Sequence, residues 1–485
     1  MTAKEPLDLL VIGSGPGGYR AAVLAALRGL KVAIVERDQW GGCCLNRGCV
    51  PKKAWHHSAR ILSNQARYAE RGIEGTLRGD LDQAWRHQKR IVHRVRDNYV
   101  DYLQRLGVDA LQGKARFLAP DRVAIAQADS TDTLTARNVI IATGSRPNPH
   151  PLIPTVPGRI LNSDMLFDHG PPAGKRVALI GSGVVATEFA FILSALGKTV
   201  SWVSRSPMLR RAHFSAHAMS ALEQALRKQN IVLRSDAFPL RVDAQREPLE
   251  IHLADEEIFE VDWICLATGR TPNSDGLGLD AAGVECDPQG FVLRNQHLQT
   301  QQSNIFAIGD CASVEMTANH ALADATVAVE NIVNGAHLRR APERVPLVVY
   351  SALEIARIGL DDDSAEDQGH EPAVGFASFE TNPCALGQDD AQGFVRLLAD
   401  MDSGALLGAE VVGDGAGELI HLLSLAPDRE SALRWLAEGV YNHPTRAEEM
   451  LNATETLAAR WGLLEQVFGT GVSDATAPPR PVQSS

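Results

Sequence analysis

One pattern occurs twice in this chain and limits its fold more than any other feature: strand, glycine turn, alanine-rich helix, strand. The first copy reads "LDLLVIGSGPGGYRAAVLAALRGLKVAIVER", and the second, "KRVALIGSGVVATEFAFILSALGKTVSWVSR", follows about 170 residues later. A single G-x-G-x-x-G is weak, but these elements in this order, twice, are typical of dinucleotide-binding units. The sequence therefore predicts the α/β class with two Rossmann-like domains.

The turn glycines suit a loop that binds phosphate. Glycine lets the backbone turn tightly and approach a pyrophosphate at a helix amino terminus, where unpaired N–H groups and the dipole favour anions. The residues in question are Gly13, Gly15, Gly181 and Gly183. Gly18 and Ala186 are expected to keep each helix close to its strand. The alternative, ordinary tight turns without a ligand, leaves the recurrence of the whole unit unexplained.

The second strands of the two copies end differently. Counting 18 positions from Gly18 reaches Glu36, whose carboxylate can accept bonds from a ribose 2′-hydroxyl. The same count from Ala186 reaches Ser204. Basic residues follow it, namely Arg205, Arg210 and Arg211. Since a hydroxyl with nearby guanidiniums accepts a 2′-phosphate that a carboxylate would repel, the second site favours NADPH. The alternative is a solvated basic loop.

Three further strand ends are spaced as if they close these sites. "VIIATGSRPN" (139–148) and "CLATGRTPN" (265–273) each end a strand in a glycine turn, at Gly144 and Gly269. "NIFAIGDCA" (304–312) presents Asp310 directly after an apolar strand. A carboxylate there can bond the polyol of the ligand, while the next helix start faces its phosphate. We therefore expect Gly144, Gly269 and Asp310 to bind cofactor.

Three of the seven cysteines lie within "GGCCLNRGCVPKK", residues 41–53. An odd count with four isolated cysteines fits a reducing compartment and one catalytic pair better than a secreted disulfide framework. Adjacent Cys43 and Cys44 would bridge poorly, because the two-residue ring is strained. A bridge from Cys44 to Cys49 requires an irregular helix start, which Gly48 permits. The residues alone leave the role of Cys43 open.

Composition excludes several classes of function. The net charge of −12 argues against a general nucleic-acid or anionic-membrane binder. No apolar run approaches the roughly 18 residues of a membrane span. The amino-terminal residues enter a strand without a basic, apolar leader, so we expect a cytoplasmic protein. We expect no metal site, and two or three domains from 485 residues.

With these motifs in order, the chain resembles the pyridine nucleotide-disulfide oxidoreductases. These FAD flavoproteins include glutathione reductase, lipoamide dehydrogenase and mercuric reductase. The resemblance runs from the first glycine turn through "GGCCLNRGCVPKK" to "NHPTRAEE" near the end. It implies FAD on the first turn, a nicotinamide nucleotide on the second (NADPH from the basic segment, with NADH possible), a redox disulfide, and a homodimer.

The resemblance also implies roles for the residues of the cysteine segment. The pattern maps the redox pair onto Cys44 and Cys49, with Cys43 in a variable position that is commonly threonine. Cys49 would face the flavin as a thiolate, and Cys44 would exchange with the substrate disulfide. Lys53 would lie beside the flavin ring, paired with Glu188 of "GVVATEFA". The neighbouring Lys52 is expected to be solvated.

A histidine motif near the end completes the implied site. "NHPTRAEE" matches the family's His-Pro-Thr-x-x-Glu, which makes His443 the acid/base and Glu448 the carboxylate that orients it. In this family that pair is contributed by the other subunit.

The same resemblance divides the chain into domains. The FAD-binding domain is discontinuous, residues 1–150 and 275–340, and the NAD(P)H-binding domain, 151–274, is inserted in it. Residues 345–470 form a carboxyl-terminal α+β dimerisation domain. The proline- and serine-rich tail, 471–485, is expected to be disordered.

The predicted function is an FAD-dependent NAD(P)H:disulfide oxidoreductase. Hydride passes from NADPH through FAD and the Cys44–Cys49 disulfide to a small disulfide substrate. The alternative is a dihydrolipoamide dehydrogenase-type enzyme that oxidises a protein-bound lipoyl dithiol with NAD. Val184, where glutathione reductases usually carry a tyrosine, favours that alternative, whereas "GCVPKKAWHHSARI" favours the first. A remote third possibility is a non-catalytic flavin-binding scaffold.

Overall fold

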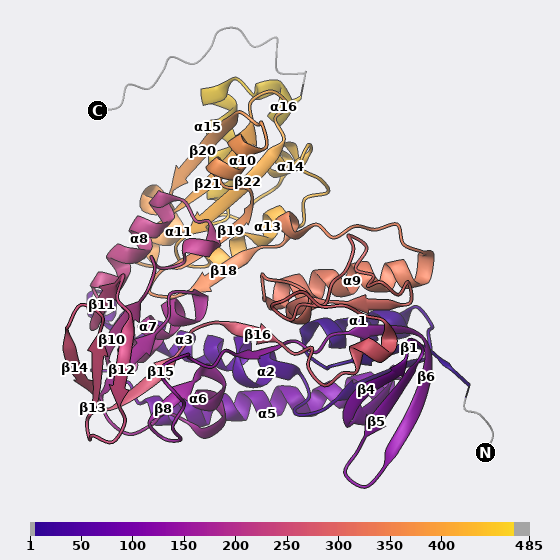
Figure 1. The fold of residues 1–485 in the computed structure, drawn as a ribbon. Helices are drawn as coiled ribbons and strands as arrows, with labels where there is room; N and C mark the ends of the chain where they lie inside the picture. Colours follow the sequence, from indigo (N-terminus) through magenta and orange to yellow (C-terminus); the bar gives the residue numbers. More distant parts are fainter. Residues whose placement is uncertain (1–4, 470–485) are drawn as a thin grey trace.

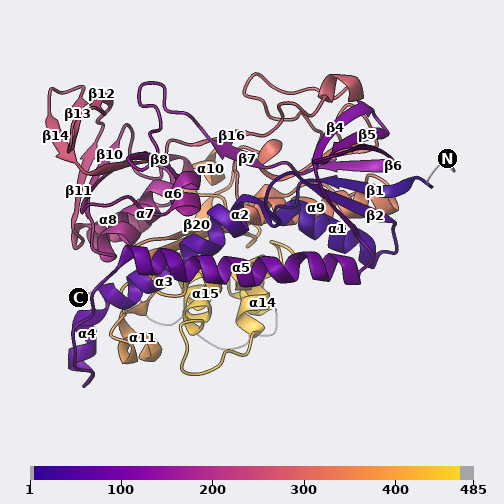
Figure 2. The same cartoon turned by 90° about the horizontal axis from the view of Figure 1, so that it is seen from below.

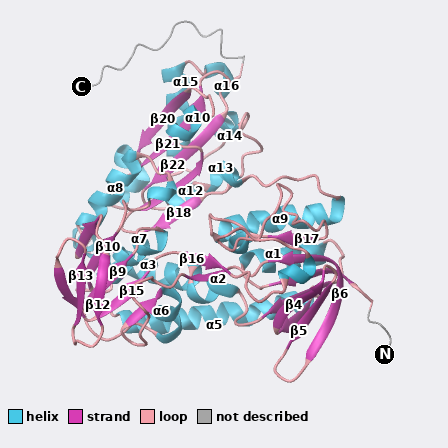
Figure 3. Cartoon of the chain, in the orientation of Figure 1, coloured by secondary structure: helices cyan, strands magenta, loops and turns pink. Residues whose placement is uncertain are grey.

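The computed structural model describes residues 5–469, which form three large sheets and two small ones with helices around them (Figure 1). Each large sheet belongs to one region of the molecule. Two lie side by side in the lower half of the view, and the third, with the last helices of the chain, lies above them (Figure 3). The predicted tail at 471–485 lies outside the described residues.

The first sheet has seven strands, and a late segment of the chain completes it. Strand β1 (Leu7–Ile12) pairs in parallel with β2 (Val32–Glu36) and with β6 (Thr131–Ile141). The remaining strands are β3 (Asp109–Gln112), β4 (Lys114–Ala119), β5 (Arg122–Ala126) and β17 (Ile305–Ala307). Helices α1 (Pro16–Leu27) and α9 (Ala318–Asn334) pack together beside this sheet. Strands β1 and β2 are mostly apolar and are buried along almost their whole length, as expected of strands covered on both faces.

The second sheet repeats this plan, so the prediction of two Rossmann-like units is confirmed. Five parallel strands run in the order β11-β10-β9-β15-β8. They are β8 (Ile160–Asn162), β9 (Arg176–Ile180), β10 (Thr199–Ser204), β11 (Ile231–Ser235) and β15 (Trp263–Leu266). The accompanying helices are α6 (Ser163–His169), α7 (Val184–Ala195) and α8 (Ala216–Arg227). A small antiparallel sheet extends the unit, made of β12 (Pro239–Asp243), β13 (Leu249–Leu253) and β14 (Ile258–Val261).

Two of the predicted strand-end motifs pair with each other where the chain crosses between these units. Strand β7 (Ser145–Pro147) runs antiparallel to β16 (Arg270–Pro272), and the N–H of Asn148 donates to the carbonyl of Gly269 at 2.9 Å. The chain thus enters and leaves the second unit at one place.

The third sheet is antiparallel and lies in the carboxyl-terminal region, as expected of the α+β domain. Its order is β18-β19-β22-β21-β20, with strands β18 (Leu347–Tyr350), β19 (Glu354–Gly359), β20 (Pro372–Ser378), β21 (Phe394–Asp400) and β22 (Leu406–Val412). Helix α15 (Glu448–Trp461) packs on β20 and β21. Shorter helices complete the region, namely α10 (Asp362–Asp367), α11 (Pro383–Gly387), α12 (Ala416–Leu419), α13 (His421–Ser424), α14 (Ala432–Glu438) and α16 (Leu464–Phe468).

Four helices follow the first glycine-turn unit and connect the three regions. They are α2 (Gly42–Arg47), α3 (Cys49–Ser63), α4 (Gln65–Glu70) and the long α5 (Leu81–Arg105), which crosses the underside of the molecule (Figure 2). Gly48 interrupts the helix between α2 and α3, with φ −140° and ψ −111°. The irregular helix start expected between Cys44 and Cys49 is therefore present.

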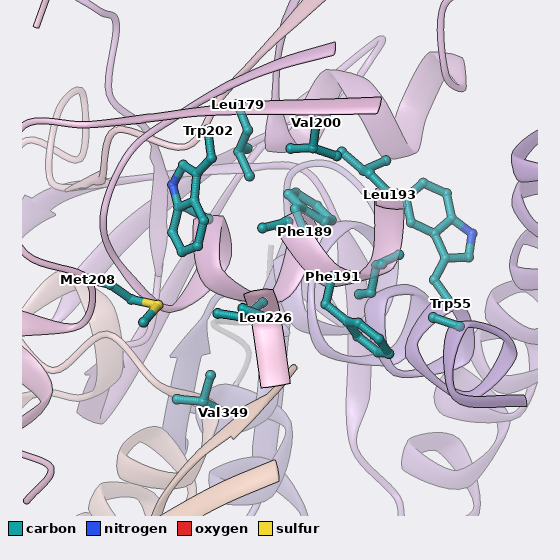
Figure 4. Packing of buried hydrophobic residues seen from close by; sticks show 14 of the residues in the cluster. Trp55, Leu179, Phe189, Phe191, Leu193, Val200, Trp202, Met208, Leu226 and Val349 are labelled. Carbon is teal, nitrogen blue, oxygen red and sulfur yellow. The ribbon is translucent and has the colours of Figure 1, made fainter. Parts of the chain in front are cut away.

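One apolar core crosses the boundary between regions. The buried cluster in Figure 4 joins Trp55 of α3 and Phe189 of α7 to Trp202 of β10 and Val349 of β18. Burial of such large side chains contributes roughly 1.5–3 kcal/mol each, so this core fixes α3 against the other two units. Within residues 5–469, no helix has both the length and the apolar character needed to cross a membrane.

Candidate functional site

A cavity of about 310 Å³ collects most of the residues that the sequence singled out for the first cofactor site. It lies at the carboxyl ends of the parallel strands, where Rossmann-like sheets bind ligands. Its lining includes the predicted residues Gly13, Gly15, Gly18, Glu36, Gly144, Asp310, Cys44 and Cys49. Gly269 is not among the lining residues and instead turns the chain into β16, with φ +102°.

The three glycines of the first turn differ in the space that a side chain would have there. Gly13 has φ +104°, and a Cβ there would lie 2.3 Å from the carbonyl oxygen of Ala142. A Cβ on Gly18 would lie 1.9 Å from the carbonyl oxygen of Gly13. A Cβ on Gly15 would meet no atom within 4 Å, because this residue faces the cavity at the start of α1. The turn therefore leaves an open cradle at a helix amino terminus, which fits a pyrophosphate.

Glu36 is held in place as an acceptor at the end of β2. Its carboxylate accepts bonds from the N–H of Ser14 at 2.9 Å, the Oγ of Ser14 at 2.7 Å and the N–H of Asp38 at 2.8 Å. The residue is 7% exposed and lines the cavity. Each carboxylate oxygen has two lone pairs, so the group can still accept a bond from a ribose hydroxyl.

Asp310 belongs to a polar cluster that sequence reasoning did not anticipate. Its carboxylate accepts a 2.6 Å bond from Ser145 Oγ, which in turn accepts one from Arg270 Nε at 2.8 Å. Arg270 also contacts Asp164 at 3.1 Å, and all four residues line the cavity. Arg270 directly follows Gly269 in "CLATGRTPN", so its position in that motif was the available signal.

The two cysteines assigned to the redox pair face each other across Gly48 as free thiols. The thiol of Cys44 donates to the sulfur of Cys49; this bond, together with the charge of Lys52, holds the pKa of Cys49 below its usual range. The same bond, with burial, raises the pKa of Cys44. Burial raises the pKa of Cys43 to about 12. Of the three thiols, Cys49 is therefore the one whose thiolate form is favoured.

The expected lysine pairing is wrong. Lys52, not Lys53, forms the ion pair with Glu188, whose side chain is only 2% exposed. Lys53 is 46% exposed and pairs instead with Glu354 at 3.6 Å. The cause is helical periodicity: Lys52 follows Cys49 by three residues and shares its face of α3, whereas Lys53 lies about 100° further round.

His443, on the loop that precedes α15, forms a pair with Glu448, the first residue of that helix. His443 Nδ1 lies 2.9 Å from Glu448 Oε1, and the N–H of Thr445 donates to Glu448 Oε2 at 2.8 Å. The N–H of Thr445, and then His443, lower the pKa of Glu448. His443 is 69% exposed and is not among the residues lining the cavity of its own chain.

The second glycine turn repeats the geometry of the first. A Cβ on Gly181 would lie 2.2 Å from the carbonyl oxygen of Ala267, while one on Gly183 would meet nothing within 4 Å. Ala186 is completely buried in α7. This turn thus also offers an open cradle at a helix start.

The basic segment lies beside that turn, with one correction. Ser204 is 1% exposed and its hydroxyl donates to the carbonyl of Ser206, so it is not presented to a ligand as expected. Ser206 Oγ lies 3.0 Å from Ser182 Oγ, and the N–H of Leu209 donates to the carbonyl of Ser182 at 2.8 Å. The three arginines of the segment, Arg205, Arg210 and Arg211, are exposed.

Comparison with known proteins finds relatives along most of the chain. Residues 7–325 match the family described as pyridine nucleotide-disulphide oxidoreductase, and residues 345–454 match the dimerisation domain of the same family. A dihydrolipoyl dehydrogenase of Thermus scotoductus is 33% identical over 458 residues, 93% of this chain and 97% of that protein. A glutathione reductase of Burkholderia cepacia is 32% identical over 467 residues, 92% and 98% of the two chains.

Solved structures share the fold. LpdA from Mycobacterium tuberculosis superposes with a TM-score of 0.86 at 23% identity, covering 93% of this chain and 99% of that one. The HOCl-induced flavoprotein disulfide reductase RclA from Escherichia coli gives 0.79 at 22% identity, covering 92% and 99%.

Proposed function

Because the chain belongs to the pyridine nucleotide-disulphide oxidoreductase family, whose enzymes use FAD and NAD(P)H, we propose that it reduces a small disulfide with NADPH through Cys44 and Cys49. The observation that carries the proposal is the hydrogen-bonded pair of thiols in the wall of the cavity, with Lys52 beside Cys49.

The cavity fits FAD by its own geometry. The open cradle at Gly15 suits the pyrophosphate, Glu36 suits a ribose hydroxyl, and Asp310 suits the polyol. Bound there, FAD supplies the two-electron relay between the nicotinamide and the sulfur pair.

The chain's own residues would carry out the exchange as follows. His443 of the second subunit takes the proton of Cys44, whose sulfur attacks the substrate disulfide to form a mixed disulfide. The first product thiolate leaves and takes that proton from His443. The Cys49 thiolate then attacks Cys44, forming the Cys44–Cys49 disulfide and releasing the second product thiolate. The dithiol is thus oxidised by two electrons, and the substrate disulfide is reduced to one thiol and one thiolate, which takes its proton from water.

The preference for NADPH is supported by the exposed arginines tied to the second glycine turn through Leu209 and Ser182. A second candidate, oxidation of a protein-bound dihydrolipoyl group with NAD, is favoured by the names of several relatives at about 30% identity. One site holds the closely spaced cysteines, and the other four cysteines are isolated free thiols. This supports a cytoplasmic location, because isolated thiols stay reduced there.

Substitution of the cysteines tests the function. Cys44→Ser and Cys49→Ser should each lower disulfide turnover by about three orders of magnitude or more while the protein keeps bound flavin, because each removes a sulfur from the couple. NADPH and NADH would be tried separately with glutathione disulfide and with lipoamide. Cys384→Ser, a half-buried cysteine on α11, is the control and should retain wild-type turnover. Full turnover by Cys44→Ser would refute the assignment.

A further inference from the structure

The end of β18 contacts both of the other regions directly behind the cysteines. The N–H of Tyr350 donates to Glu188 Oε1 at 2.9 Å, and Ser351 Oγ donates to the carbonyl of Thr187 at 2.9 Å, both on α7. The carbonyl of Ser351 lies 3.1 Å from Nε2 of His56 on α3. Ser351 and His56 are each 1% exposed. We call Tyr350 and Ser351 the junction segment, since helices from two other regions meet on it.

The side chain of Lys53 contacts the junction segment and the strand that follows it. Its Nζ lies 3.4 Å from the centroid of the Tyr350 ring and 3.6 Å from Glu354 Oε1, at the start of β19. Glu354 is 7% exposed in its side chain and also lies 3.5 Å from Arg60. A cation over an aromatic face is worth roughly 0.5–2 kcal/mol, more where water is excluded. Lys53 therefore ties α3 to the β18–β19 hairpin.

The junction segment fixes one end of the ion pair next to Cys49. Glu188 has one carboxylate oxygen on the N–H of Tyr350 and the other on Lys52. Because the Glu188 side chain is 2% exposed, water does not replace either partner easily. The direction in which Glu188 holds Lys52 thus depends on where the main chain of Tyr350 lies.

We propose that Lys53, acting through the ring of Tyr350, is a positioning residue that keeps the Lys52–Glu188 ion pair in its place beside Cys49. This rests on the proposed role of Cys49 as the redox thiolate. It gives the carboxyl-terminal region a part in the redox centre of its own chain, in addition to dimerisation.

The surroundings of Cys49 indicate what happens when this ion pair moves from its place. The titratable groups that face it come from five elements and are Cys43, Cys44, Lys52, Tyr99, Glu188 and Tyr350. Lys52 is the cation in this set, and its charge favours the thiolate, whereas Glu188 opposes it. If the junction segment shifts, Lys52 follows Glu188 or separates from it. In either case the charge of Lys52 stabilises the Cys49 thiolate less.

The test measures the ionisation of Cys49 without relying on turnover. Reduced protein is alkylated with iodoacetamide over a range of pH, denatured and digested with trypsin. Cleavage after Arg47 and Lys52 places Cys49 in the peptide 48–52, apart from Cys43 and Cys44. Lys53→Met and Tyr350→Leu should raise the apparent pKa of Cys49 by about one unit, which is about tenfold slower alkylation below that pKa. Lys53→Arg and Tyr350→Phe, which keep the cation and the ring, should stay near wild type.

A matched control separates positioning from stability. Arg71, near the end of α4, pairs with Asp389 of the carboxyl-terminal region at 3.9 Å and does not line the cavity. Arg71→Met should leave the Cys49 profile unchanged even if the melting temperature falls. An unchanged profile in Lys53→Met or, should that variant not fold, in Tyr350→Leu would overturn the proposal, as would an equal shift in Arg71→Met. Since alkylation needs no substrate, the outcome is independent of the Cys44→Ser turnover test.

Discussion

The difference between neighbouring glycines determines what each one contributes to the cofactor site. Gly13 is required by packing, because its φ of +104° and the nearby Ala142 carbonyl exclude a side chain. Gly15 has φ −62°, which any residue adopts, and has free space around it. We therefore expect that glycine at position 15 serves the ligand and not the fold.

Gly15→Ala tests that distinction. We expect a melting temperature near that of wild type but at least roughly tenfold weaker FAD binding, since the new methyl group occupies the pyrophosphate cradle. Flavin content per chain and affinity for added FAD are the measurements. Gly13→Ala, in contrast, should lower the melting temperature as well. A Gly15→Ala protein that purifies with a full complement of flavin would contradict this view.

Motif residues could be predicted from sequence because their chemistry is tied to spacing along the chain. Lys52 and Lys53 could not be ranked in this way, because a one-residue difference on a helix becomes a difference of face only when the neighbours of that helix are known. The prediction that Ser204 faces a ligand is wrong for a similar reason. Its hydroxyl donates to the carbonyl of Ser206, which spacing along the chain does not show.

At the scale of elements, α3 presents a different chemistry on each face. Cys49 and Lys52 face the cavity, Trp55 enters the shared apolar core, and Lys53 and His56 meet the junction segment. The amphipathic pattern of α3 predicts a helix, but only the tertiary structure shows which partner each face meets.

Burial of His56 makes this contact sensitive to acid. Burial lowers the pKa of His56 to about 3, against about 6.5 for an unfolded histidine. The unfolded chain therefore binds the proton more tightly, and stability falls as the pH drops from about 6.5 toward 3, by about 2 kcal/mol at about pH 5. His56→Gln should show a smaller loss of urea stability between about pH 7 and pH 5. His87→Gln, an exposed histidine on α5, should behave as wild type, and equal slopes in all three proteins would refute this assignment.

At the scale of the whole molecule, the position of the His443–Glu448 pair bears on how two copies of the chain assemble. The match to the dimerisation domain supports a homodimer. His443 does not line the cavity of its own chain, so we expect it to serve the cysteines of the partner. The sequence motif predicts a catalytic histidine at position 443, but spacing along one chain does not show which subunit it serves.

Mixed dimers test that expectation. Cys44→Ser and His443→Ala homodimers should both be nearly inactive. After the two are unfolded and refolded together in equal amounts, half of the dimers are mixed and each has one complete site, so activity should recover to about a quarter of wild type. Failure to recover, with mixed dimers demonstrated by mass spectrometry, would place the histidine in its own subunit's site.

The paired strands β7 and β16 also bear on how such an enzyme can diversify. Since Asn148 and Gly269 are hydrogen-bonded neighbours, everything from one to the other forms a module whose two ends lie together. A homologous module joined at those two points would keep the first sheet intact, but it would also replace Asp164 in the cavity wall and Glu188, the partner of Lys52. Coenzyme preference can therefore be exchanged with the module only if the new module keeps these two carboxylates.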